Sequence, residues 1–99
     1  MIKTQNIHLV NNIFQKKGLI VSDMGEEKVI LSVKNGKYYN LGEMGGEIWD
    51  LIEEPTPVKK VIEKLMSDYH VEQHECEEEV LLFLESLLKE QLIEIGKEQ

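Results

Sequence analysis

The chain contains no arginine and only one cysteine among its 99 residues. Arginine is the side chain best suited to read guanine edges and phosphates, because it makes paired hydrogen bonds to them. The formal net charge of −8 would in addition repel a duplex. Nucleic-acid binding is therefore not expected. The single cysteine, Cys76, has no partner for an internal disulfide, which is typical of a reducing compartment.

Long apolar runs are also lacking. The longest, Val80–Leu84, is far too short to span a bilayer, and the first residues do not form the apolar segment of a signal peptide. We therefore expect a cytoplasmic protein with one core. Residues 1–18 hold three lysines and no acid, a charge of +3, whereas residues 19–99 hold eight lysines and 19 acids, a charge of −11. A basic peptide or a basic patch on a partner protein would suit this charge.

Few side chains are placed to carry chemistry. His70, His74 and Cys76 lie close in sequence, but their spacing offers no fourth zinc ligand. Cys76 is followed by three glutamates, which would raise rather than lower the pKa of its thiol. There is no glycine-rich phosphate loop and no Ser-His-Asp arrangement. We expect no metal, no cofactor and no catalytic activity.

The first half of the chain has the alternating pattern of β-strands. The three predicted strands span residues 19–24, 27–33 and 37–41. Asn35-Gly36 predicts a type I′ turn between the last two, so the three form an antiparallel meander. The pattern of residues 1–18 is weaker, and an N-terminal arm and a short extra strand are both open there. Residues 19–95 are expected to form the domain.

Three helices are predicted after the strands, over residues 43–54, 57–69 and 75–89. Thr56 is expected to cap the second helix, with Pro57 at its first position. Gly45-Gly46 costs about 1 kcal/mol per glycine in a helix, which favours close packing against a neighbour. The third helix has an apolar arc of about 160°, wider than the roughly 100° that one core requires. Residues 91–95 form a last short strand or a tail.

This order predicts an α+β fold, a three-stranded antiparallel β-meander followed by three helices on one face of the sheet, similar to a winged helix-turn-helix unit. The edge of the third strand would then be unpaired beside an apolar helix. Such an edge binds extended peptides by strand addition. Tyr38 and Tyr39 point to opposite faces of that strand, so we expect one of them to be exposed.

The spacing of this region resembles the PqqD-like family of small peptide chaperones, also called RiPP recognition elements, and most of all the stand-alone leader-binding proteins of lasso-peptide pathways. The matching residues are Gly36, Tyr38, Tyr39, Leu41, Gly45, Ile48 and Trp49. Gly42 stands where the family has asparagine. The resemblance covers about residues 19–95.

The resemblance implies a non-catalytic adaptor. It would bind the leader of a ribosomally made precursor peptide as an added strand and deliver it to a separate cysteine protease, with a cyclase acting next. The implied backbone pairing involves Lys37, Tyr38, Tyr39, Asn40 and Leu41. One margin of the third helix would line the groove, formed either by Val80, Leu81, Leu84 and Leu88 or by Phe83 and Leu87. Glu77, with the two glutamates after it, would attract lysines of the peptide.

Three alternatives remain open from the sequence. The chain could be a PqqD-like accessory protein that delivers a precursor peptide to a radical enzyme. It could be a winged-helix transcription regulator, although the glutamates of the third helix argue against DNA binding. It could be a small enzyme that uses Cys76, in which case replacing this residue with serine would abolish activity.

Overall fold

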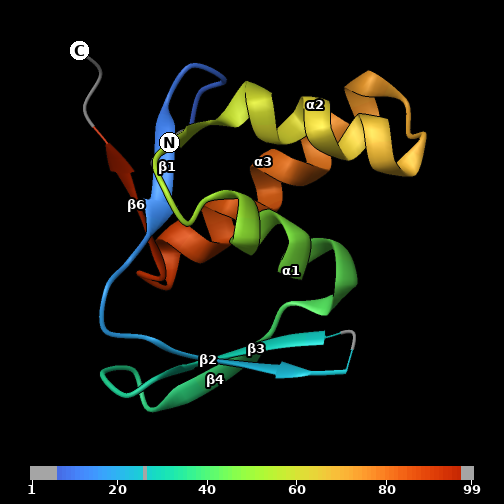
Figure 1. Cartoon of the computed structure of the whole chain (residues 1–99). Helices are drawn as coiled ribbons and strands as arrows, with labels where there is room; N and C mark the ends of the chain where they lie inside the picture. Colours follow the sequence, from blue (N-terminus) through green and yellow to red (C-terminus); the bar gives the residue numbers. More distant parts are fainter. Residues whose placement is uncertain (1–6, 26, 97–99) are drawn as a thin grey trace, which may run out of the picture.

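The strands of the protein form two separate antiparallel sheets joined by three helices (Figure 1), in a computed structural model that describes residues 7–25 and 27–96. One sheet has the strand order β2-β3-β4, and the other has the order β5-β1-β6. The strands are β1 (Asn12–Gln15), β2 (Ile20–Met24), β3 (Glu27–Ser32), β4 (Lys37–Asn40), β5 (Thr56–Pro57) and β6 (Ile93–Gly96). The helices are α1 (Gly42–Leu51), α2 (Val58–Tyr69) and α3 (Gln73–Lys89).

The predicted meander is confirmed as the β2–β3–β4 sheet. Ile30 of β3 lies opposite Val21 of β2 and Tyr39 of β4, and its side chain is fully buried towards the helices. The next residues along the strands point to the outer face of the sheet. There Ile20 and Tyr38 are 52% and 75% exposed, so this face of the sheet is open.

The turn between β3 and β4 is wider than predicted. Ser32 pairs with Lys37, which leaves four residues in the loop. Gly36 has a positive φ of 68°, whereas Asn35 does not, so a type I′ turn is excluded. The Ser32 hydroxyl instead accepts a hydrogen bond from the Asn35 backbone N–H at 3.1 Å. This frees the Asn35 side chain to reach across to the end of α3.

The start of α2 also differs from the prediction. Thr56 and Pro57 form the short strand β5 and pair with Ile13 and Asn12 of β1. The Thr56 hydroxyl donates to the carbonyl oxygens of Leu51 and Glu54 and does not cap the helix. Pro57 therefore ends the strand at the N-cap position and does not begin the helix.

The second sheet was not predicted. Its central strand, β1, lies in the segment for which an arm and a strand were both open; residues 1–6 lie outside the described part of the chain. Its edge strand β6 corresponds to the predicted last strand. The three helices consequently do not cover one sheet together: α1 packs on β3, whereas α2 and α3 pack on each other and next to β5 and β6.

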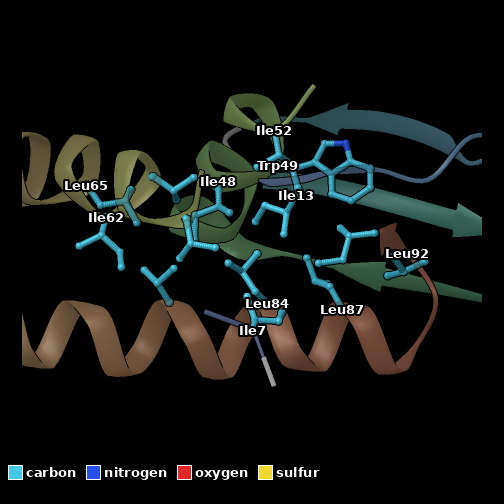
Figure 2. Packing of buried hydrophobic residues seen from close by; sticks show 14 of the residues in the cluster. Ile7, Ile13, Ile48, Trp49, Ile52, Ile62, Leu65, Leu84, Leu87 and Leu92 are labelled. Carbon is cyan, nitrogen blue, oxygen red and sulfur yellow. The ribbon is translucent and has the colours of Figure 1, made fainter. Parts of the chain in front are cut away.

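The core lies between the helices and β1 (Figure 2). Ile48 and Trp49 of α1 meet Leu65 of α2, Leu84 of α3 and Ile13 of β1 within one buried cluster. Trp49 is thus a core residue.

None of the helices in the described part of the chain is long and apolar enough to cross a membrane.

Candidate functional site

The outer edge of β4 carries unpaired backbone groups. The Leu41 N–H donates to the Lys28 carbonyl at 2.9 Å, so alternate residues of the strand, including Tyr39, have their backbone groups turned towards β3. The N–H and C=O groups of Tyr38 and Asn40 therefore point to the open edge. An extended chain can pair with them.

Glycine and asparagine shape the end of this edge. Gly42 begins α1 with a positive φ of 76°, which glycine adopts without strain. The Asn40 side-chain oxygen accepts a hydrogen bond from the Gly42 N–H at 3.0 Å, and its amide donates to Glu27 at 2.8 Å. Asn40 thus provides, two residues before Gly42, an acceptor for the first backbone N–H of the helix.

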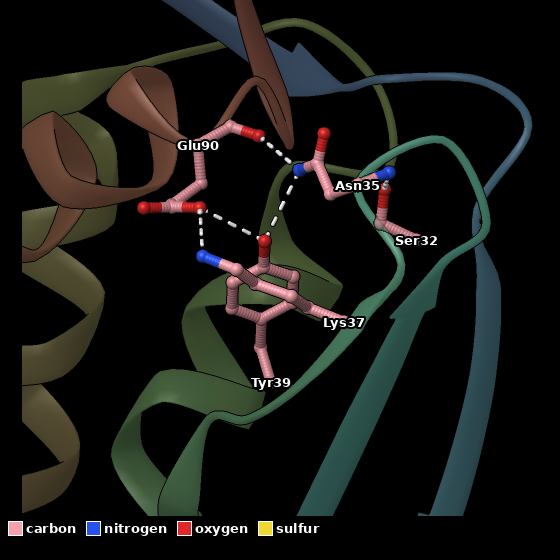
Figure 3. A network of polar contacts seen from close by, with 5 residues as sticks. All are labelled: Ser32, Asn35, Lys37, Tyr39 and Glu90. Atoms are coloured by element: carbon pink, nitrogen blue, oxygen red, sulfur yellow. Dashed lines mark hydrogen bonds and ion pairs between the residues drawn. The ribbon is translucent and has the colours of Figure 1, made fainter.

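A polar network holds the β3–β4 hairpin against the end of α3 (Figure 3). The Tyr39 hydroxyl donates to the Glu90 carboxylate at 2.9 Å. The Asn35 amide donates to the Tyr39 hydroxyl at 3.1 Å and to the Glu90 carbonyl at 2.9 Å, and the Lys37 ammonium lies 3.8 Å from the Glu90 carboxylate. The network fixes the distance between β4 and α3.

Two glycines bring α1 close to its neighbours. A Cβ atom at Gly45 would lie 2.9 Å from Cζ of Phe83 on α3, and one at Gly46 would lie 3.2 Å from Cβ of Lys28 on β3. The Lys28 ammonium pairs with Asp50 at 2.8 Å and Asp23 at 2.9 Å, and these hydrogen bonds raise the pKa of Lys28. The close packing expected from Gly45-Gly46 is confirmed.

Phe83 and Glu90 identify the side of α3 that faces α1 and β4. They are two helical turns apart and so lie on one side of the helix. An apolar cavity of about 40 Å³ lies on this side, lined by Met44, Val71, Glu75, Cys76, Glu79 and Val80. A polar cavity of about 310 Å³ lies at the other end, lined by Asn35, Lys37, Lys89, Glu90 and Gln91. The apolar cavity lies between α1 and α3, and the polar cavity lies between the β3–β4 hairpin and the end of α3. We call the side of α3 that runs from one cavity to the other, next to β4 and the start of α1, the β4–α3 groove.

Of the remaining residues predicted on α3, Val80 also lines the apolar cavity, and the others lie elsewhere. Val80 and Leu84 are buried in the core. Glu77, Leu81 and Leu88 lie about 150° around the helix from Phe83 and Glu90. Glu77 lines a separate cavity of about 350 Å³ with residues of α2 and with Leu9. The structure therefore brings Lys37–Leu41 together with Phe83 and Glu90, and it does not bring Glu77 to β4.

Cys76 has the surroundings of a core residue. Its side chain is buried, and burial, followed by the negative charges of Glu79 and Glu77, raises the pKa of the thiol. In residues 7–25 and 27–96, no group of three His, Cys, Asp or Glu side chains is arranged to hold a metal ion.

Two solved structures have a similar fold. TbiB1, determined in complex with the TbiA(beta) leader peptide, matches with a TM-score of 0.76 and 24% identity, covering 87% of this chain and 99% of TbiB1. The PqqD part of Methylobacterium extorquens PqqCD, described as a functional, stand-alone RiPP recognition element, matches with a TM-score of 0.75 and 14% identity, covering 89% of this chain and 94% of that one. The predicted α+β fold is thus confirmed.

No curated protein sequence matches the chain significantly. The sequence model of a family does match it, over residues 27–93, which is well over half of the chain. That family is coenzyme PQQ synthesis protein D, and the chain therefore belongs to the PqqD family.

Proposed function

We propose that the chain is a non-catalytic adaptor that binds the leader segment of a ribosomally made precursor peptide as an additional strand on β4. The observation that carries this proposal is the row of unpaired backbone groups at Tyr38 and Asn40, held beside α3 by the Tyr39–Glu90 hydrogen bond. Support comes from TbiB1, a protein of the same fold that was determined with a leader peptide bound. The precursor would be met in the cytoplasm, where it is synthesised.

In this proposal the peptide main chain pairs with Lys37–Leu41, and its side chains enter the β4–α3 groove. Contacts in the structure favour the Phe83 margin of α3 as the helical wall, because Phe83 meets α1 and lies on the side of Glu90. Val80 and Leu84 would support this wall from the core. The alternative margin, with Glu77, Leu81 and Leu88, would require a peptide on the α2 side of α3.

We further propose that the loaded adaptor delivers the leader to a separate cysteine protease, followed by a cyclase, as in lasso-peptide maturation. The resemblance of Gly36, Tyr38, Tyr39, Leu41, Gly45, Ile48 and Trp49 to the leader-binding proteins of lasso-peptide pathways favours this route. Delivery to a radical enzyme is the second candidate, favoured by membership of the PqqD family. Binding measurements with each class of enzyme, in the presence and absence of leader, would distinguish the two.

The direct test is a fluorescence-anisotropy titration with the labelled leader of the precursor encoded nearest to this chain, with labelled duplex DNA as a control. We expect a dissociation constant of about 1 μM or tighter for the leader and no binding of the duplex. The control variant is Val21→Ala, which lies on β2 at the opposite edge of the sheet from β4. It should bind the leader with the affinity of the wild type. Leader affinity that is no greater than that of a scrambled peptide would contradict the proposal.

A further inference from the structure

The β4–α3 groove is positive at the end where β4 begins. Lys37 and Lys89 line one cavity there, and the Lys34 ammonium is 3.5 Å from the side-chain oxygen of Gln91 in the same lining. Glu90 is the only acid among the described residues that line this cavity. The Glu90 carboxylate already accepts a hydrogen bond from the Tyr39 hydroxyl. Its ion pair with the Lys37 ammonium is long, at 3.8 Å. The lysines therefore outnumber the acids, so this end keeps a positive charge even with Lys37 paired to Glu90.

The other end of the groove has the opposite character. The cavity near the start of α1 is lined by the apolar side chains of Met44, Val71 and Val80, and by Glu75 and Glu79. No lysine is among the described residues of this lining. An apolar side chain fits this end, and a basic group next to it would meet the two carboxylates.

The two ends are far enough apart to act separately. On α3 the first end lies at Lys89 and the second at Glu75–Glu79, ten to fourteen residues apart, a separation of about 15–21 Å at roughly 1.5 Å per residue. This exceeds the Debye length of about 8 Å at physiological ionic strength. Each end therefore acts on a nearby ligand group through its own charges, although the net charge of the chain is −8.

We infer that the segment bound at β4 carries an acidic side chain at the Lys37–Lys89 end and, about four to six residues away at roughly 3.3 Å per residue, an apolar side chain with a basic neighbour at the Glu75–Glu79 end. This inference rests on the proposed function. It follows because alternate side chains of an added strand face the same side, so residues four or six apart both enter the groove. The ligand is thus a segment of divided charge, in place of the uniformly basic peptide that the net charge favours.

The test is a selection of displayed random peptides, long enough to pair with all of β4, against the wild-type chain and against the variant K37E/K89E. The control is K59E/K60E, which has the same net charge but places both changes on α2, away from the β2–β3–β4 sheet (Figure 1). The side chain of Lys37 is 61% exposed, and Lys89 is also exposed, so both variants should fold; thermal unfolding curves check this.

We expect wild-type binders to be enriched in Asp or Glu at one groove-facing position, and K37E/K89E to select Lys or Arg there. A synthetic wild-type binder should lose about tenfold in affinity with K37E/K89E and less than about twofold with K59E/K60E. Binders that protect the Tyr38 and Asn40 amides but show no charge preference, or equal losses with both variants, would overturn the inference. If no selected peptide protects these amides, the proposed function itself fails.

Discussion

At the scale of single residues, Tyr38 and Tyr39 show how one strand serves two purposes. The Tyr39 side chain points to the groove and is tied to Glu90, whereas the Tyr38 side chain is exposed on the outer face. Their backbone groups have the reverse arrangement, because those of Tyr39 pair with β3 and those of Tyr38 point to the open edge. The Tyr39 side chain thus positions the strand, and the Tyr38 backbone groups are free to pair with an added strand.

The hydroxyl of Tyr39 provides the first prediction. Tyr39→Phe removes the hydrogen bond to Glu90 and one acceptor for Asn35, so we expect the free energy of unfolding to fall by about 1 kcal/mol. The matched control Tyr38→Phe should change it by less than about 0.5 kcal/mol, because that side chain is exposed. Urea denaturation measures both. Equal effects would mean that the network of Figure 3 does not stabilise the hairpin.

Amide exchange tests the open edge residue by residue. In the free protein the amides of Tyr39 and Leu41 should already be protected by pairing with β3, whereas those of Tyr38 and Asn40 should exchange rapidly. Leader binding should then slow exchange at Tyr38 and Asn40 specifically. NMR-detected exchange with and without peptide resolves the four sites, and slowing at all of them alike would argue for general stabilisation without strand addition.

At the scale of elements, the contact between α1 and α3 depends on a missing side chain. Alanine is better than glycine in a helix by about 1 kcal/mol, but a Cβ at Gly45 would collide with the Phe83 ring. We expect Gly45→Ala to lower the free energy of unfolding by about 1–3 kcal/mol through overpacking. In a Phe83→Leu background the same change should cost less, or stabilise. A double-mutant cycle by urea denaturation measures the coupling, and additive effects would assign the glycine another role.

A carboxylate between α1 and α2 makes stability depend on pH. A hydrogen bond with Asp68 and burial raise the pKa of Glu47, while the hydroxyl of Tyr69, at 3.0 Å, and the charge of Lys64 lower it. A raised folded-state pKa means that the folded protein binds the proton more tightly than the unfolded chain. This stabilisation is therefore present below the ordinary value of 4.5 and is lost as the pH rises through the folded-state pKa.

Glu47→Gln mimics the protonated form and keeps an oxygen for the Tyr69 hydroxyl. We expect the variant to be more stable than the wild type at pH 7, with a difference that shrinks as the pH falls towards 4.5. Thermal unfolding across this range measures the change. A difference that is constant with pH would contradict the assigned protonation, and Glu63→Gln on the exposed side of α2 controls for the loss of one charge.

The elements that could be read from the sequence are those with local, repeated patterns. The alternation of Glu27–Ser32 and the apolar stripe of α3 gave their positions within two residues. The β5–β1–β6 sheet has no such pattern, because Thr56–Pro57 is only two residues long and its pairing with β1 spans more than forty residues. Short, distant pairings are determined by tertiary packing.

The same division holds within the groove. The strand predicted over residues 37–41 agrees with β4 (Lys37–Asn40), because the alternation of a strand is visible in the sequence. Glu90 was missed because it follows the end of α3, where helical periodicity carries no information, and its importance depends on a hairpin fifty residues earlier in the chain. Its contact with Asn35 was hidden as well, since Asn35-Gly36 was interpreted only as a turn.

At the scale of the whole molecule, β1 connects parts of the chain that are distant in sequence. Its residues pair with β5 on one side and β6 on the other. The Gln15 N–H donates to the Ile52 carbonyl at 3.2 Å, and the Gln15 side-chain amide donates to the Trp49 carbonyl at 2.8 Å. The segment before the meander is therefore joined to the end of α1, the start of α2 and the last strand.

This arrangement predicts that the N-terminal strand and the peptide-binding half unfold together. Ile13 is fully buried at the centre of β1, so Ile13→Ala should lower the free energy of unfolding by about 2–5 kcal/mol, whereas Val10→Ala, at an exposed position, should have little effect. Trp49 fluorescence and far-UV circular dichroism should follow one common transition in urea. A detachable arm would behave differently: Ile13→Ala would leave the Trp49 transition in place. In that case the β4–α3 groove would be stable without β1, because packing among the helices alone would hold it.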